Sequence, residues 1–161
     1  MKKIVFLIFA LFAANSAFSQ KQMPNVTLTS DTNKSFNVKN DFNEKDKLYV
    51  FAFWATWCAP CLNELDAINE YYATWSKELN MELIAVSIDD TRTQKRVKPL
   101  LNGKNWTYTI LLDTNQDLKR ALAIANVPYT IVVKNQKIVY VHNGYSQGAE
   151  MELYNKLKEL K

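Results

Sequence analysis

The chain has 161 residues, of which 48% are hydrophobic and 22% are charged, so it can form one domain with an ordinary core. Lysine and arginine total 20 against 16 aspartate and glutamate residues, a net charge of +4. This excess is too small to indicate binding to nucleic acid or to a membrane surface. The three glycines and four prolines leave no low-complexity linker.

The start of the chain follows the order of a secretory signal peptide. Two lysines precede an apolar run over residues 4–14, and small residues then lead to Ser19. This order predicts a signal peptide over residues 1–19 and an exported domain, soluble after cleavage, over residues 20–161. The alternative is a retained N-terminal anchor, although the apolar run is short for a membrane span.

The rest of the sequence alternates between strand and helix patterns. In chain order it predicts strands over 26–29, 35–38 and 48–53, a helix from 58 to about 79, a strand over 83–88, a helical segment over 93–101 interrupted at Pro99, and a strand over 107–112. Then follow a short helix with Thr114 and Asp117 as its capping box, strands over 130–133 and 137–141, and a helix that places Met151, Tyr154, Leu157 and Leu160 on one side. The last two strands are so close that they must form an antiparallel hairpin. The order predicts an α/β fold, a mixed sheet with helices on both faces.

The only two cysteines, Cys58 and Cys61, lie where a buried strand gives way to a helix. A helix N-terminus carries partial positive charge and unpaired N–H groups, which stabilise the thiolate that attacks disulfides. The pair therefore indicates dithiol–disulfide exchange. A purely structural disulfide would stabilise so short a ring by only roughly 2 kcal/mol. A zinc site needs four ligands, whereas the chain has two cysteines and one histidine, so we expect neither metal nor cofactor.

Three further features carry a resemblance to a known family. They are the run FWATWCAPC over residues 53–61, Glu64 three residues after it, and Val127-Pro128 before a strand. From about residue 24 to residue 160 the chain resembles the thioredoxin fold and, more closely, exported bacterial thiol-disulfide oxidoreductases of the TlpA/ResA type. The resemblance implies an enzyme of the periplasm that reduces disulfides of exported proteins, cytochrome c precursors awaiting haem among them. It also implies a membrane dithiol carrier of the DsbD or CcdA kind as electron donor.

The resemblance and the helix position together assign roles near the cysteines. Cys58, at the helix start, is expected to face solvent and to act as the nucleophile, while Cys61 resolves the mixed disulfide. Glu64 matches an acid that this family places near the sulfurs, where it could accept a proton. The alternative for Glu64 is an exposed glutamate favoured by the helix dipole. Trp57 is expected to form an apolar rim for substrate, with plain core packing as the alternative.

Val127 and Pro128 are expected to bind substrate. The resemblance implies a cis peptide bond between them, with Pro128 facing the cysteine pair and Val127 able to pair with an extended substrate strand. An ordinary trans proline that opens a strand is the alternative.

Some positions depart from thioredoxins or stay without a role. Ala52 stands where thioredoxins carry a buried aspartate, which leaves Glu64 or water for proton transfer. Asp66 replaces a proline of many relatives, so the helix is expected to run straight. His142 is expected to be a partly buried histidine on the last strand. Asp89-Asp90 is expected to be a polar loop rather than a metal pair.

Other functions remain open at the level of sequence. An exported thiol oxidant or isomerase would use the same fold and the same pair, and its redox potential would distinguish it from a reductase. A copper-binding chaperone would use Cys58, Cys61 and His142 as ligands, although such chaperones separate their cysteines by three residues, not two. A peroxiredoxin-type peroxidase is disfavoured because the sequence has no Pro-x-x-x-Thr-x-x-Cys run.

Overall fold

The computed structural model describes residues 21–161, so the signal peptide expected over residues 1–19 lies outside the described residues. The elements follow the chain in this order: β1 (Thr27–Ser30), β2 (Ser35–Asn37), β3 (Leu48–Trp54), α1 (Ala59–Glu78), β4 (Met81–Ser87), the 3₁₀ helix η2 (Gln94–Arg96), α2 (Val97–Asn102), β5 (Thr109–Leu112), α3 (Asp117–Ala121), β6 (Tyr129–Lys134), β7 (Lys137–Asn143) and α4 (Ala149–Leu160). Within the described residues, the strands form one seven-stranded sheet in the order β2-β1-β5-β4-β3-β6-β7.

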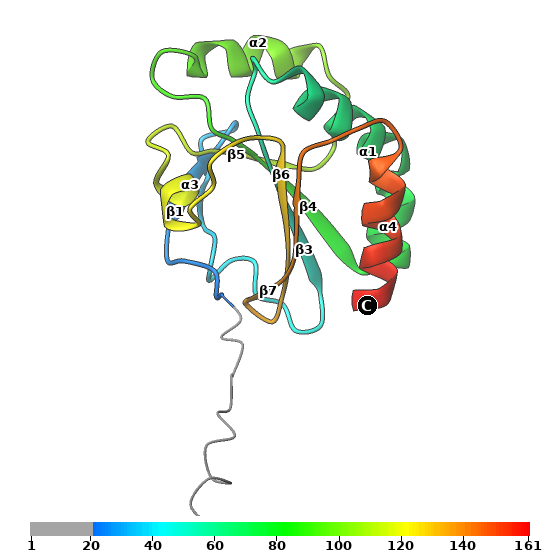
Figure 1. Ribbon diagram of the computed structural model, residues 1–161. Coiled ribbons are helices and arrows are strands. Elements are labelled where there is room, and N and C mark those ends of the chain that lie inside the picture. Colours follow the sequence, from blue (N-terminus) through cyan, green and yellow to red (C-terminus); the bar gives the residue numbers. More distant parts are fainter. Residues whose placement is uncertain (1–20) are drawn as a thin grey trace, which may run out of the picture.

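The sheet is mixed, as the sequence predicts. β3 runs parallel to β4 on one side and antiparallel to β6 on the other. β4 and β5 are parallel, whereas β1 is antiparallel to both β2 and β5. β6 and β7 form the predicted antiparallel hairpin. Helices α1 and α4 lie on one face of the sheet and α3 lies on the other (Figure 1), which confirms the predicted thioredoxin-like architecture.

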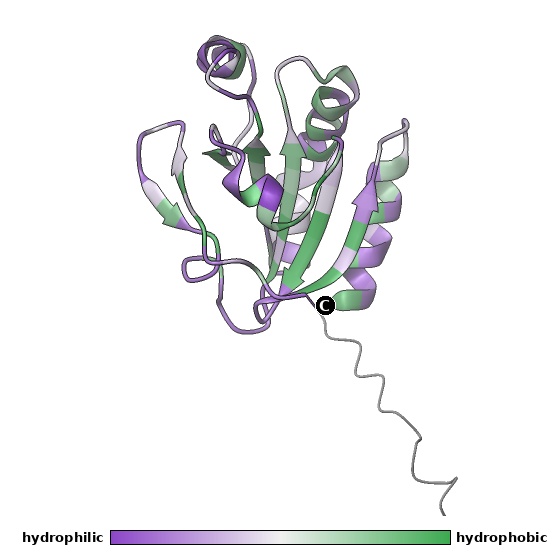
Figure 2. Cartoon of the chain, turned by 60° about the vertical axis from the view of Figure 1, so that its left-hand side comes forward, coloured by the Kyte–Doolittle hydropathy of each residue, from purple (hydrophilic) through white to green (hydrophobic). Residues whose placement is uncertain are grey.

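The core follows the centre of this sheet. Every residue of β3 is buried, and so is every residue of β4 except Glu82. Strands covered by helices on both faces need such continuous apolar sequence. Figure 2 shows the central strands largely in green and the outer loops largely in purple. Trp75 of α1 stacks on Tyr154 of α4, with ring centroids 5.0 Å apart, so the two helices that cover one face also pack against each other.

Each predicted strand bound lies within two residues of the observed one, but two expectations about the helices are wrong. Pro99 does not interrupt a helix, because it lies in the first turn of α2, where backbone N–H groups have no intrahelical acceptor to lose. Met151 is not on the buried side of α4. Its exposed fraction is 41%, whereas Leu157 is buried as predicted and Leu153 is buried in place of Met151.

The capping box predicted for α3 is also wrong. Thr114 bonds through its hydroxyl to the Gln94 side chain, 3.2 Å away, and the helix has no side-chain N-cap hydrogen bond. The backbone N–H groups of Leu118 and Lys119 instead donate to the buried carboxylate of Asp113, at 3.2 and 2.8 Å. The preceding strand end thus supplies the acceptor that the sequence assigned to the helix itself.

Within residues 21–161, no helix combines the length and the apolarity that crossing a bilayer requires.

Candidate active site

The cysteine pair begins at a tight turn between β3 and α1. After Trp54 the chain turns over residues 55–58, and the Cys58 N–H donates to the carbonyl oxygen of Ala55 at 3.0 Å. Cys58 is the N-cap residue of α1, and Pro60 stands in its first turn, where a missing N–H costs no helical hydrogen bond. The structure therefore places Cys58 at the helix N-terminus, as the sequence predicts.

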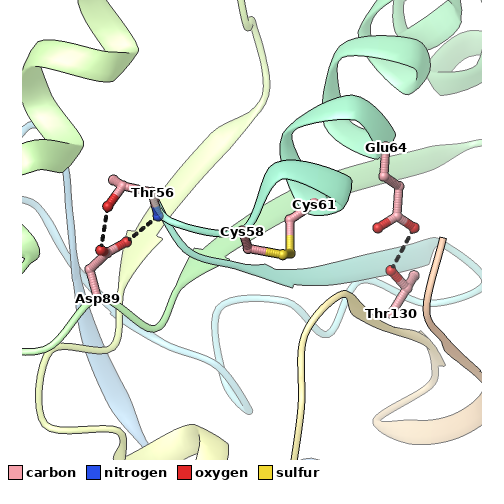
Figure 3. Close-up of a disulfide and its surroundings, with 6 residues drawn as sticks. All are labelled: Thr56, Cys58, Cys61, Glu64, Asp89 and Thr130. Carbon is pink, nitrogen blue, oxygen red and sulfur yellow. Dashed lines mark hydrogen bonds between the residues drawn. A yellow bond between two sulfur atoms is a disulfide. The ribbon is translucent and has the colours of Figure 1, made fainter.

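Cys58 and Cys61 are joined by a disulfide, with their Cα atoms 5.3 Å apart (Figure 3). Their exposed fractions are only 5% and 1%. Cys58 is thus slightly the more accessible of the two, but in the disulfide form it is buried and does not face solvent as expected. Trp57 beside it is 57% exposed, which rules out the core-packing alternative for this side chain.

Glu64 is buried three residues after Cys61 on α1. Its exposed fraction is 4%, and Figure 3 shows its side chain leaving the same side of α1 as Cys61 and pointing toward Thr130. The Thr130 hydroxyl donates to the Glu64 carboxyl at 3.2 Å. The alternative of an exposed glutamate is therefore wrong.

Burial controls the acidity of this carboxyl group. Loss of hydration disfavours the charged form and raises the pKa of Glu64 to about 7, while the hydrogen bond from Thr130 acts in the opposite direction and the negative charge of Glu150 adds to the rise. A carboxyl group with a pKa near neutrality can both take up and release a proton under working conditions. The Glu64 carboxyl group is thus suited to exchange a proton with a thiol.

The tertiary structure brings Val127 and Pro128 to the end of the sheet where β3 leads into the cysteine turn. The peptide bond between them is cis, as expected. Because Tyr129 at the start of β6 lies opposite Phe53 near the end of β3, the residues before β6 adjoin the end of the sheet from which the cysteine turn extends. Pro128 is buried and Val127 is partly exposed.

Asp89 is a site residue that the sequence did not reveal. It was expected to lie in a polar loop, a description that fits only Asp90, which pairs with Arg92. Asp89 is 2% exposed and accepts hydrogen bonds from both the backbone N–H and the hydroxyl of Thr56 (Figure 3). One signal was available, because β3 and β4 are parallel and residues just after such strands meet at one edge of the sheet.

Two further expectations concern residues outside the pair. Helix α1 runs without interruption past Asp66, which accepts a hydrogen bond from the Trp106 indole at 2.8 Å. His142 lies partly buried on β7 with its ring stacked on Tyr140. Across residues 21–161, no group of three or more His, Cys, Asp or Glu side chains is arranged to hold a metal ion.

Comparison with known proteins then decides the family. The model described as AhpC/TSA family matches residues 19–142. The chain belongs to the AhpC/TSA family. Curated relatives of this AhpC/TSA member include the thiol-disulfide oxidoreductase ResA of Bacillus thuringiensis subsp. konkukian, 28% identical over 137 residues that cover 84% of this chain and 76% of the relative.

Solved structures agree with the fold of this AhpC/TSA member. A thioredoxin-like protein from Porphyromonas gingivalis is 44% identical, with a TM-score of 0.74 over 86% of this chain and 90% of the other. StoA from Bacillus subtilis, 19% identical with a TM-score of 0.65 over 82% and 99% of the two chains, shares the fold. Together with the Cys58–Cys61 disulfide, these findings make this family member a redox enzyme, a thiol-disulfide oxidoreductase.

Proposed function

We propose that this AhpC/TSA-family protein reduces disulfides of exported proteins through Cys58 and Cys61. The observation that carries the proposal is the position of the pair at the N-terminus of α1, with the carboxyl group of Glu64 buried on the same side of the helix. The helix end stabilises a thiolate. The carboxyl group, with its pKa near 7, provides a proton acceptor at the same place.

The reaction consists of two thiol–disulfide exchanges. The Cys58 thiolate attacks one sulfur of the substrate disulfide, which forms a mixed disulfide and releases the other substrate sulfur as a thiolate. Cys61 then gives its proton to Glu64 and attacks the sulfur of Cys58. The Cys58–Cys61 bond forms, the bond to substrate breaks, and the second substrate sulfur leaves. The substrate gains the two electrons that the enzyme pair loses. Its two thiolates then take up two protons, one returned by Glu64 and one from water.

Trp57, Val127 and Pro128 are the proposed substrate contacts. The exposed indole of Trp57 lies next to the nucleophile and offers an apolar surface. Val127 and Pro128 precede β6, at the end of the sheet where β3 finishes. There the backbone of Val127 can pair with an extended substrate segment.

The proposal includes a compartment and partners. The domain works in the periplasm after removal of residues 1–19, on disulfide-containing exported proteins such as cytochrome c precursors. A membrane dithiol carrier of the DsbD or CcdA kind returns the enzyme to the dithiol form and itself becomes oxidised. Support comes from the FWATWCAPC run over residues 53–61 and from the ResA relatives.

A trapping experiment in the exporting cell tests the assigned roles. Cys61→Ser should accumulate mixed disulfides between the protein and its substrates, which a reductant releases, because nothing resolves the first bond. Cys58→Ser should trap nothing. Trapping by Cys58→Ser instead would make Cys61 the attacking residue. If neither variant traps substrate and the double variant keeps full function, dithiol exchange is not what the protein does.

The direction of electron flow has its own test. The equilibrium constant of the Cys58–Cys61 pair with glutathione should correspond to a reductant, with a potential near or below that of the thioredoxins, about −270 mV. A strongly oxidising pair, with a potential near about −120 mV, would overturn the proposed direction and favour the oxidant or isomerase.

A further inference from the structure

Asp89 holds the segment that carries the first cysteine. It follows β4 directly, and its carboxylate accepts from the backbone N–H of Thr56 at 2.8 Å and from the Thr56 hydroxyl at 2.7 Å. The Ser87 hydroxyl donates to the same carboxylate at 2.9 Å. Burying a carboxylate costs free energy unless donors surround it, and here Thr56 supplies two of these three donors.

Thr56 belongs to the turn that presents Cys58. It lies between Ala55, whose carbonyl oxygen accepts from the Cys58 N–H at 3.0 Å, and the exposed Trp57. Where the pairing of β3 with β4 ends, the Ile88 N–H donates to the carbonyl oxygen of Trp54 at 2.8 Å. Beyond that point, Asp89 is the group that fixes the turn to the sheet through Thr56 (Figure 3).

We propose that Asp89 is a positioning residue for the redox pair: by holding Thr56, it keeps the Cys58 sulfur within reach of Cys61. This inference rests on the proposed function, in which Cys58 attacks and Cys61 resolves.

The hydrogen bonds between Thr56 and Asp89 are most important in the mixed disulfide with substrate. While Cys58 is bonded to a substrate sulfur, no disulfide joins it to α1, so the turn over residues 55–58 is held by its hydrogen bonds. Cys61 must then attack the Cys58 sulfur, forming the Cys58–Cys61 bond and releasing the substrate sulfur as a thiolate. A turn fixed by Asp89 raises the effective concentration of one sulfur at the other.

The test measures that effective concentration. Oxidised protein is equilibrated with mixtures of glutathione and glutathione disulfide, quenched with acid, and analysed by mass for the dithiol, the disulfide and the Cys58–glutathione adduct. Asp89→Asn should lower the equilibrium constant for closing the disulfide about three- to tenfold, the factor expected when hydrogen bonds to a charged group are weakened. The glutathione adduct should rise by a similar factor.

Matched variants separate positioning from general effects. Asp90→Asn removes the neighbouring, partly exposed carboxylate, which bonds to Arg92, and should leave the constant unchanged. Thr56→Val removes the donated hydroxyl and should reproduce part of the Asp89→Asn effect, whereas Thr56→Ser keeps the donor and should restore the wild-type value. If Asp89→Asn does not fold, the two Thr56 variants decide the question.

The outcomes are distinguishable. A purely structural role would destabilise the dithiol and disulfide forms equally, so unfolding would become easier while the constant stayed at its wild-type value; that result overturns the inference. An equal shift in Asp90→Asn would indicate a general charge effect and would also overturn it. If the wild-type pair does not exchange with glutathione at all, the proposed function itself fails.

Discussion

Ala52 of β3 lies directly opposite Thr130 of β6 in their antiparallel pairing. Residues opposite each other share one face of the sheet, so Thr130 stands beside the methyl group of Ala52 and donates its hydroxyl to Glu64 of α1. Ala52 occupies the position at which thioredoxins carry a buried aspartate. In this chain, α1 supplies the buried acid that β3 lacks.

Replacing this acid should remove proton transfer at the pair. In Glu64→Gln, turnover at pH 7 should slow by about 10²-fold, the usual contribution of a positioned acid–base group. The wild-type rate should change with pH around the Glu64 pKa of about 7, and the variant should lose that step. The measurement is the rate of disulfide reduction from pH 5 to pH 9. Glu70→Gln, on the exposed side of α1, is the control. An unchanged profile would return proton transfer to water.

The same carboxyl group should make stability depend on pH. Because folding raises the pKa of Glu64 from 4.5 to about 7, the folded state holds this proton more tightly than the unfolded state. The contribution of this proton to the stability of the fold is complete below pH 4.5 and is lost as pH rises through 7. Relative to wild type, Glu64→Gln should therefore gain stability between these pH values, with an upper bound of about 3 kcal/mol. Urea unfolding at pH 4.5 and pH 8 measures it, and a difference independent of pH would contradict the assignment.

The two cysteines should differ in reactivity once the disulfide is reduced. Cys58 caps α1 while Cys61 lies inside the first turn, so the helix N-terminus should lower the pKa of the Cys58 thiol and favour its alkylation. At pH near 7, iodoacetamide should label Cys58 much faster than Cys61, as peptide mass mapping at short times would show. Equal labelling, or faster labelling of Cys61, would reverse the two roles.

The carboxylate that caps α3 should be important for stability. Asp113→Ala leaves the backbone N–H groups of Leu118 and Lys119 without their acceptor, which should lower the free energy of unfolding by about 1–3 kcal/mol. Thr114→Ala, at the position where the sequence predicted the cap, should cost less than about 0.5 kcal/mol. Chemical denaturation of both variants compares them. A larger loss in Thr114→Ala would show that the predicted capping box contributes after all.

The expected signal peptide can be tested directly. Expressed in a Gram-negative host, the full chain should yield a periplasmic protein whose first residue lies near Gln20, because the small residues before it match a cleavage site. N-terminal sequencing of the fractionated product gives the answer. Folded protein that begins at Met1 and sediments with the membrane would mean that the segment is retained as an anchor.

Individual strands and helices could be predicted because their signals are local. The apolar run of β3 and the helical spacing after Cys61 are each contained in a short stretch of sequence, and periodicity reports such elements directly. The place of the cysteine pair could also be predicted from local sequence alone, because its position between a strand and a helix puts it at a helix N-terminus.

The wrong predictions concern features that depend on a residue of another element, namely the cap of α3 and the buried face of α4. Thr114 had the right spacing for a cap, but Asp113 at the end of β5 was better placed to meet the N–H groups of α3. Met151 fitted the helical stripe of α4 that contains Leu157, yet the fold leaves Met151 exposed and buries Leu153. Local spacing does not reveal which acceptor or which face the rest of the fold makes available.

The sequence by itself determined the redox pair and the strand–helix junction that carries it, because both follow from residues close together in the chain. The order of the elements along the chain predicted the mixed sheet. Only the tertiary structure decided that Glu64 is buried and that Asp89 belongs to the site. Thr130 is 66 residues from Glu64, and Asp89 is 33 residues from Thr56. Burial and hydrogen bonding between such distant residues depend on which strands become neighbours, and that is settled when the sheet and α1 pack together.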